Sequence, residues 1–366
     1  MTITRTALAR TGAAALAVAS AATLALPATT ADAASRRPAP GAGWTVAVWA
    51  PHFGAKGKLY LTDPVGHRRT IASTPKNTWV AAWSGDGARV LLATGETTST
   101  GYSLVSVRTG HARRVHLPDN ATVLGFTKPK GLALRVTVPE AHGRVVYERM
   151  LRFDLDGHRP AVYPITITGA GTLATYARPV ETPDGSRLVL GADRGAVVLG
   201  NNGTLQRRLL TTKRYCNASG FWRTGVALVS CNGTLWAAPL SGAKATRVSA
   251  APKGANPFGY DTAWRYSRGT LGLAQNGCGP DSLVRFDSHG NGRRLKITTP
   301  VRHAGRPVVI GHGGDRVLMT VSPHAGCGSG RNTLVSWNAV TGRSTALLGP
   351  GVNGGTVVSA LAFGTT

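Results

Sequence analysis

The stretch Trp83-Ser84-Gly85-Asp86-Gly87-Ala88-Arg89-Val90 joins an apolar run at 81–83 to a second apolar run at 90–92. An Asp-Gly pair between apolar runs is a strong signal for a β-hairpin, because glycine supplies the positive φ that the tight turn needs. Related turns recur at 183–185 and 313–315. The stretch therefore predicts two antiparallel strands, and its recurrence predicts a repeated all-β unit.

A second kind of hairpin follows these turns, with an apolar strand, a tight turn and an outer strand whose first residues are basic. Its copies are spaced by roughly 40 to 50 residues, which is the period of a four-stranded propeller blade. Their turns lie at 64–66, 108–110, 156–157, 201–203, 241–242, 288–290 and 341–342. The sequence thus predicts an all-β fold, a seven-bladed β-propeller, ahead of six or eight blades. A β-sandwich is the alternative, although sandwiches rarely hold one period over so many copies.

The two ends of the repeat array predict how the ring closes. The array begins with an outer hairpin at 44–71 and finishes with an unaccompanied apolar run at 357–363. A propeller ring leaves no long sheet edge exposed only if its last blade is completed. We therefore expect the C-terminal run to supply the innermost strand of the N-terminal blade.

The N-terminal region has the pattern of a secretory signal peptide. Arg5 and Arg10 precede an apolar stretch at 12–27, and Ala31-Asp32-Ala33 supplies a small-x-small cleavage site. The apolar core is shorter than the about 20 residues of a transmembrane helix, so a membrane anchor is the weaker alternative. We predict a signal peptide over 1–33, a flexible leader over 34–43 and a single propeller domain over 44–366. The protein is expected to be secreted, without a membrane span, and able to associate with the cell wall.

The chain is strongly basic, with 42 Lys and Arg against 16 Asp and Glu and a net charge of +26. A GC-rich genome explains the preference for Arg over Lys but not the shortage of acids. The charge indicates anionic neighbours. The expected partners are an anionic cell-wall polymer, a polysaccharide or a protein. Nucleic acid is less expected, because no aromatic residues for base stacking interleave with the basic ones.

Basic residues recur at or just beyond the turn before the outer strand of every predicted blade. They are Arg68, Arg69, Arg113, Arg114, Arg159, Arg207, Arg208, Lys244, Arg247, Arg293, Arg294 and Arg343. Charges on an outer strand prevent edge-to-edge aggregation, which is one interpretation of this pattern. The other is a basic rim that binds anionic polymers, since acids would protect edges equally well and none alternate with the arginines.

Four cysteines in an exported protein are expected to pair. If the hairpin turn lies at 223–224, residues 222 and 225 face each other, and Cys216 then lies opposite Cys231. Cys278 and Cys327 fall in the same loop of consecutive blades, which predicts a bond between those blades. A four-cysteine metal site is the weaker alternative because no Cys-x-x-Cys spacing is present.

Catalytic and cofactor patterns are missing from the sequence, which contains no Gly-x-Ser-x-Gly, His-Glu-x-x-His or phosphate-binding loop. Most carboxylates fall in hairpin turns, where Asp serves backbone geometry. Asp119, Glu140 and Asp261 are scattered exceptions. His67, His111 and His158 recur with the repeat and do not predict a metal site. No cofactor is expected.

One further cluster of basic and imidazole side chains falls in loops of two adjacent blades, on the other face from the basic rim. Its members are Arg302, His303, Arg306, His324 and Arg331. We interpret this cluster as a candidate binding patch.

The stretch at 83–90 resembles the W-S-P-D-G-x-x-I/L signature of TolB-like and WD40-like bacterial propeller repeats. Residues 182–188 match its Pro-Asp-Gly part without the Trp. The resemblance implies the propeller fold, while such propellers include scaffolds, binding proteins and enzymes. We therefore expect a non-catalytic binding or scaffold propeller at the cell surface. The alternative is a propeller hydrolase or lyase with an axial active site, which would need paired acids, or His with Glu, inside an open axial pocket.

Overall fold

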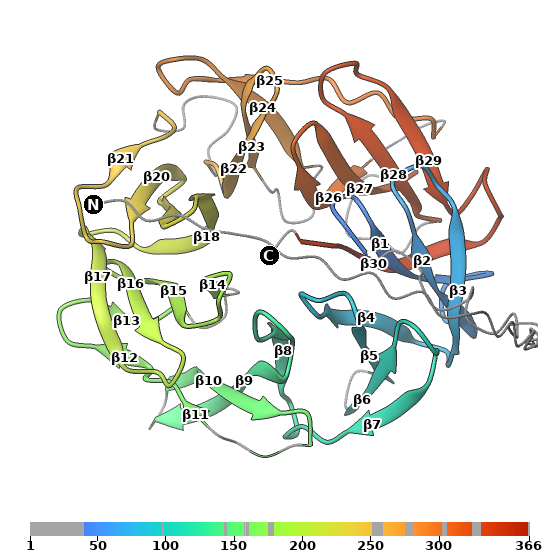
Figure 1. Ribbon diagram of the computed structural model, residues 1–366, viewed down its shortest axis with the longest axis horizontal. Coiled ribbons are helices and arrows are strands. Elements are labelled where there is room, and N and C mark those ends of the chain that lie inside the picture. Colours follow the sequence, from blue (N-terminus) through green and yellow to red (C-terminus); the bar gives the residue numbers. More distant parts are fainter. Residues whose placement is uncertain are drawn as a thin grey trace, which may run out of the picture. The chain divides into compact units, whose positions relative to one another are not determined.

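The computed structural model describes residues 40–96, 99–142, 145–156, 158, 161–174, 179–250, 259–274, 281–301, 306–323 and 331–364. They belong to one compact unit, Ala39–Thr366. All regular elements of the described residues are β-strands. Seven four-stranded sheets are arranged as a ring (Figure 1), which confirms the predicted seven-bladed propeller.

Each blade is an antiparallel meander that runs from an innermost strand outward. Blade 1 is β30 (Thr356–Ala362), β1 (Thr45–Ala50), β2 (Gly57–Thr62) and β3 (Arg68–Thr74); blade 2 is β4 (Thr78–Trp83), β5 (Arg89–Glu96), β6 (Ser99–Ser106) and β7 (Ala112–Val115). Blade 3 is β8 (Thr122–Phe126), β9 (Ala133–His142), β10 (Val145–Asp154) and β11 (Ala161–Val162); blade 4 is β14 (Val180–Glu181), β15 (Arg187–Ala192), β16 (Gly195–Gly200) and β17 (Leu205–Thr211). Blade 5 is β18 (Cys216–Arg223), β19 (Val226–Cys231), β20 (Thr234–Pro239) and β21 (Thr246–Arg247); blade 6 is β22 (Thr262–Tyr266), β23 (Gly269–Ala274), β24 (Ser282–Phe286) and β25 (Gly292–Arg294). Blade 7 is β26 (Arg306–Gly313), β27 (Arg316–Ser322), β28 (Thr333–Asn338) and β29 (Ser344–Leu348).

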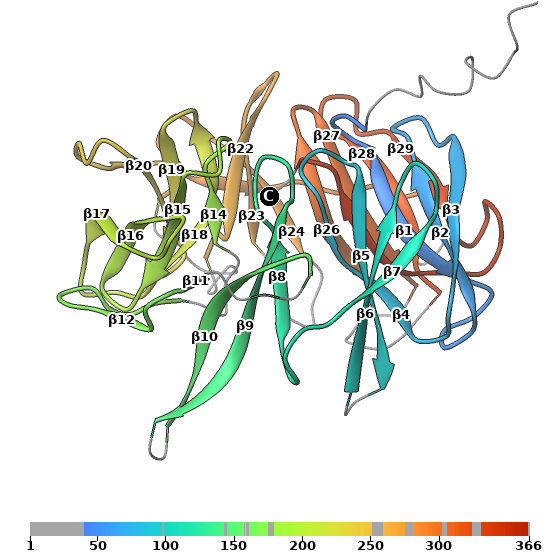
Figure 2. The same ribbon diagram turned by 60° about the horizontal axis from the view of Figure 1, so that its bottom comes forward.

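A small hairpin of β12 (Thr166–Ile167) and β13 (Gly171–Thr172) lies between blades 3 and 4 in sequence. The β9–β10 hairpin of blade 3 is long and extends well beyond the ring in Figure 2. We call the four strands of a blade a to d from the inside outward. In such a meander the a–b and c–d turns lie at one end and the b–c turn at the other, so the ring has two distinct faces.

The predicted closure of the ring is confirmed. β30 pairs antiparallel with β1, with Val46 opposite Leu361 and Ala47 opposite Ala360. Apolar side chains of β30 are buried with those of blade 7, where Val357 and Leu334 are both fully buried. The hydroxyl of Ser359 also accepts a hydrogen bond from the backbone N–H of Val80 at 2.7 Å, which ties β30 to blade 2. The C-terminal strand therefore joins three blades.

The apolar cores lie between neighbouring blades, because alternate residues of each strand face one side of the sheet or the other. One core packs Val46, Val48 and Leu59 of blade 1 against Val90 and Leu92 of blade 2. Similar cores follow around the ring. The turns between strands are stabilised by aspartates, as predicted. The Asp63 carboxylate accepts hydrogen bonds from three successive N–H groups, at 2.8 to 3.0 Å.

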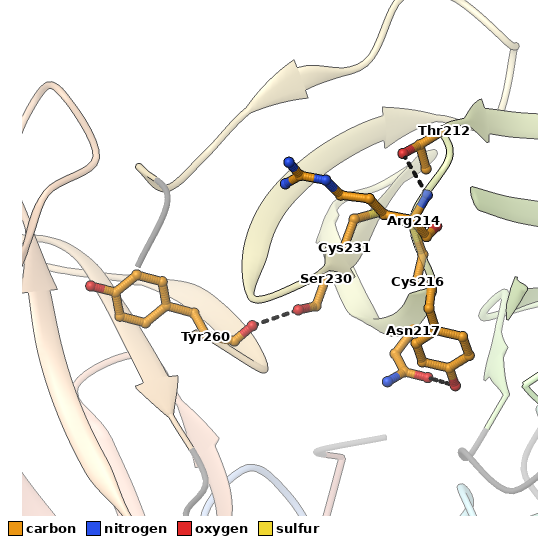
Figure 3. The surroundings of a disulfide bond; sticks show 8 residues. Thr212, Arg214, Cys216, Asn217, Ser230, Cys231 and Tyr260 are labelled. Atoms are coloured by element: carbon orange, nitrogen blue, oxygen red, sulfur yellow. Dashed lines mark hydrogen bonds between the residues drawn. A yellow bond between two sulfur atoms is a disulfide. The ribbon is translucent and has the colours of Figure 1, made fainter. Parts of the chain in front are cut away.

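The predicted Cys216–Cys231 disulfide is present in blade 5 and is shown in Figure 3. The predicted turn was one residue off, because Arg223 pairs with Val226 and the turn lies at 224–225. Gly225 adopts a φ of 72° there, which glycine supplies more readily than the Thr224 of the predicted turn. Two bulges in β18 then shift the register back and bring Cys216 opposite Cys231. Cys278 and Cys327 lie outside the described residues, and their bond stays a prediction.

We expect the ring to depend on β30. Deleting 356–366 removes the innermost strand of blade 1 and exposes the apolar side chains that it covers, so the truncated protein should aggregate or be digested rapidly by a protease. Deleting only 364–366, which follow the strand, is the control and should leave a folded monomer. Size-exclusion chromatography and limited proteolysis decide the matter, and a protease-resistant 356–366 deletion would contradict the closure argument.

Candidate binding site: axial cavity and basic rim

The centre of the ring holds a cavity of about 820 Å³. Residues from the innermost strands of all seven blades line it, namely those of β30, β4, β8, β14, β18, β22 and β26. The side chains of the described residues therefore leave space at the centre of the ring. Its size falls in the range of small-ligand pockets in proteins.

Bulges at small residues help to keep the cavity open. The pairing of the innermost strand with its neighbour shifts between Val123 and Gly125 in blade 3, and between Ala218 and Gly220 in blade 5. Gly125 and Gly220 have φ values of 153° and 148°, and no atom lies within 4 Å of the position that a Cβ would take. These glycines leave space in the cavity wall where another residue would project a side chain. Sequence reasoning missed the bulges, although glycine inside a strand pattern is a known sign of one.

A buried ion pair forms part of the wall on the side of blades 3 and 4. Arg135 donates to both carboxylate oxygens of Glu181 at 2.7 Å, and the two side chains are 3% and 4% exposed. Asn201 accepts a third hydrogen bond from Arg135 at 2.8 Å. Burial alone would lower the pKa of Arg135, but the hydrogen bonds with Glu181 outweigh it and raise that pKa. The pair links the second strand of blade 3 to the innermost strand of blade 4.

Lys128 lies beside this pair in the a–b turn of blade 3 and also lines the cavity. Its backbone N–H donates to Glu181 at 2.7 Å. Burial lowers the pKa of the Lys128 ammonium, Glu181 opposes that shift, and Arg135 adds to it. Lys128 and Arg135 thus place two cationic side chains near Glu181 in this part of the cavity wall.

Aromatic side chains gather around the same end of the cavity. Trp83, Phe126 and Phe363 lie at or just after the ends of their innermost strands and line the cavity, with the rings of Trp83 and Phe363 5.0 Å apart. His312 of blade 7 also lines it and stacks on Trp264, with ring centroids 3.9 Å apart. Burial lowers the pKa of His312 to about 4, so this imidazole is neutral at pH 7.

The opposite end of the cavity is polar and belongs to blades 5 and 6. Asp261 precedes β22, and Asn217 lies near the start of β18. Asn217 pairs in register with Ser230 directly beside the disulfide, and Tyr215 donates to its side-chain oxygen at 2.7 Å. Ser230 donates to the Tyr260 carbonyl at 2.6 Å (Figure 3). The disulfide thus holds the strand pair that carries two of these polar side chains.

The predicted rim arginines that the structure describes lie on or directly before the outer strands, and their side-chain contacts divide them into two groups. Arg159 lies outside the described residues. Arg69 donates to the Val107 carbonyl of the next blade at 2.7 Å, and Arg113 forms an ion pair with Asp156 of the next blade at 3.2 Å. Arg208 donates to the Thr168 carbonyl. These three side chains connect neighbouring parts of the ring, a role that sequence reasoning missed because the partners lie about one repeat away.

The second group consists of exposed arginines whose side chains form no hydrogen bond or ion pair within the described part of the chain. It includes Arg68, Arg114, Arg207, Arg293 and Arg294. They follow the c–d turns, which lie on the same face as the a–b turns. The basic rim and the aromatic end of the axial cavity therefore share one face of the propeller.

The second predicted patch falls largely outside the described residues, because Arg302, His303 and His324 are not among them. Arg306 begins β26, and Arg331 is exposed before β28. The patch stays a prediction. Of the scattered carboxylates, Asp261 lines the cavity, whereas Glu140 pairs with Arg149 on the β9–β10 hairpin. No group of three His, Cys, Asp or Glu residues that could hold a metal occurs in the described ranges. None of the described segments forms a helix able to cross a membrane.

No protein-family model and no curated protein matches the sequence. Solved structures do resemble the fold. They include prolyl oligopeptidase B from Galerina marginata, with a TM-score of 0.52 and 11% identity over 84% of this chain and 48% of that chain. A puromycin-hydrolyzing peptidase of Mycobacterium tuberculosis has a TM-score of 0.50 and 12% identity over 82% of this chain and 50% of that chain. TolB from Acinetobacter baumannii is also among them, at 0.48 and 15% over 88% of this chain and 68% of that chain.

The two peptidase structures resemble this chain in fold. At such identities the likeness concerns the fold alone. The chain also spans about half the length of the two peptidases. The activities in their names therefore belong to those proteins.

The buried ion pair predicts a large loss of stability when one partner is removed. Glu181→Gln leaves the Arg135 charge buried without a counter-ion, which costs about 3 to 5 kcal/mol of the free energy of unfolding. Asp156→Asn, which breaks the exposed pair with Arg113, is the matched control and should cost about 0 to 1 kcal/mol. Urea unfolding at pH 7 measures both variants, and equal effects would show that the buried pair is no more important than a surface pair.

His312 predicts that stability falls as the medium becomes mildly acidic. Its pKa is about 4 in the folded protein against 6.5 in the unfolded chain, so between these values the unfolded state binds a proton that the folded state does not. The stabilisation is present above pH 6.5 and is lost as the pH falls, by roughly 2 kcal/mol between pH 7 and 5. His312→Phe keeps a ring against Trp264 and should remove this part of the pH dependence in urea unfolding. If the stability of this variant depends on pH as strongly as that of the unaltered protein, a group other than His312 titrates in this range.

Proposed function

We propose that this chain is an exported, non-catalytic binding propeller whose basic rim holds an anionic cell-wall polymer or polysaccharide. The observation that carries the proposal is the group of exposed rim arginines without partners in the described residues, Arg68, Arg114, Arg207, Arg293 and Arg294. They come from four different blades and lie on one face. A polyanion contacting several of them at once would gain a favourable interaction at each blade.

Export is supported by the signal-peptide pattern at 1–33 and by the disulfide in blade 5. Disulfides persist in oxidising compartments and are rare in the cytosol. A wall-associated location would also bring the basic face close to anionic polymers. The proposal therefore combines an extracellular location with the positive charge of the chain.

The carboxylate geometry supports binding rather than hydrolysis. Glycoside hydrolysis needs two carboxyl groups flanking the scissile bond, one of them able to donate a proton. Both oxygens of Glu181 accept hydrogen bonds from Arg135, so this side chain is already engaged in the cavity wall. Asp261 lies at the other end of the cavity, before β22. An axial hydrolase or lyase is thus the weaker hypothesis.

The test replaces four partnerless rim arginines together, as Arg68→Gln, Arg114→Gln, Arg207→Gln and Arg293→Gln. If each contact contributes about 0.5 kcal/mol, binding to immobilised poly(glycerol phosphate) at low salt should weaken by roughly 30-fold. The binding of the unaltered protein should itself fall as salt rises and the Debye length shrinks to about 8 Å.

The matched control changes the same amount of charge on the opposite face, as Lys76→Gln, Arg194→Gln, Lys213→Gln and Arg331→Gln. These exposed residues lie in or beside d–a and b–c loops. The control should retain most of the affinity. If both sets weaken binding equally, only net charge matters. If the control set alone weakens binding, the opposite face binds the polymer, and the rim arginines act only to prevent edge-to-edge aggregation of the outer strands.

A further inference from the structure

Aromatic rings from four neighbouring blades gather at one end of the axial cavity. Trp83, Phe126 and Phe363 come from blades 2, 3 and 1, and His312 comes from blade 7. The innermost strands of these blades, β26, β30, β4 and β8, follow one another around the ring (Figure 1). All four side chains are only partly buried and line the cavity. We call them the aromatic wall.

Contacts within the chain fix the orientation of these rings. The indole N–H of Trp83 donates to the Gly87 carbonyl at 3.2 Å, and the Phe363 ring packs against Trp83 with ring centroids 5.0 Å apart. His312 stacks on Trp264 with an angle of 9° between the two ring planes. A wall that is already ordered loses little side-chain entropy when a ligand binds to it.

The charged and hydroxyl side chains at this end of the cavity already interact with one another. Arg135 donates to Glu181, and the electrostatic interaction of Lys128 is with the same carboxylate. The Ser84 hydroxyl donates to Asp86 at 2.6 Å. A ligand with many polar groups would lose its hydrogen bonds to water here without replacing them, and each unpaired group costs free energy. This end of the cavity therefore favours a ring system with few polar atoms over a sugar.

His312 is the polar member of the aromatic wall. Its imidazole forms no hydrogen bond with the residues that the structure describes, and its ring contact is the stacking on Trp264. The ring is neutral at pH 7, because burial lowers its pKa to about 4. A neutral imidazole has one nitrogen that donates and one that accepts. A hydroxyl group of a ligand, which can do both, would pair with His312 in either tautomer.

We propose that the axial cavity binds an uncharged ligand with a small fused aromatic ring system and one hydroxyl group. The rings lie against Trp83, Phe126 and Phe363, and the hydroxyl group is hydrogen-bonded to His312. The cavity of about 820 Å³ is large enough for such a ligand. The site involves none of the rim arginines and takes a different class of ligand from the polymer proposed above.

The test measures the binding of β-naphthol to the full chain by equilibrium dialysis at pH 7, with the fluorescence of the ligand as the readout. Naphthalene has the same rings but leaves His312 without a hydrogen-bond partner, so it should bind roughly fivefold more weakly. His312→Phe removes the ring nitrogens and should abolish this preference for β-naphthol. Phe363→Leu keeps an apolar side chain but removes one ring of the wall, so it should weaken the binding of both ligands by roughly threefold.

Two matched control variants change the same residue types outside the cavity. Phe221→Leu alters a partly buried phenylalanine near the end of β18, and His116→Phe alters an exposed histidine directly after β7. Both should bind the two ligands as the unaltered protein does, and so should the fourfold variant of the rim arginines. Urea unfolding of each variant confirms that it is folded before dialysis.

The proposal is overturned if β-naphthol does not bind up to its solubility limit, or if His312→Phe and Phe363→Leu both leave its binding unchanged. Tighter binding of β-naphthoate would reveal an anion site, and tighter binding of diacetylchitobiose would reveal a sugar site. Either result would contradict an uncharged aromatic ligand. Polymer binding by the rim is judged by its own test, so failure of naphthol binding leaves that proposal unaffected.

Discussion

The antiparallel pairing of β30 with β1 is the constraint on which the rest of the structure depends. A propeller blade has a hydrophobic surface on each side and buries both against its neighbours only if the ring is complete. The pairing makes one blade from the two ends of the domain, and Val357, Ala360 and Ala362 of β30 are buried in it. Without that blade, its two neighbours would each expose an apolar face to water. Ring closure is therefore a packing requirement for all seven blades.

Closure also determines the shape of the centre. Seven innermost strands cannot approach the axis closely enough to contact one another across it, so side chains must fill the space or leave it open. This chain leaves it open, because Gly125 and Gly220 occupy positions where larger residues would reach inward. The same small residues bulge the strands and free backbone groups from regular pairing. A cavity lined by backbone groups and a few charges is the consequence.

The fold could be predicted from the sequence because its signals are local. Asp-Gly turns and alternating apolar residues lie within a few positions of one another, and their recurrence gave the blades, the closure and the Cys216–Cys231 bond. The axial site could not be predicted in the same way, because Arg135 and Glu181 are 46 positions apart and meet only through blade packing. One signal was available. Arg135 interrupts the apolar run of β9 and is buried there, and a buried arginine requires a counter-ion.

The sparse acids explain how one chain carries both a basic surface and a balanced interior. Asp63, Asp154 and Asp287 are held in turns, where hydrogen bonds from backbone N–H groups contribute to lowering their pKa values. Glu181 is buried with Arg135. The three aspartates keep their charge and lie on the same face as the arginines of the outer strands. The positive charge of the rim therefore comes from the excess of basic over acidic residues and not from the use of the acids in turns.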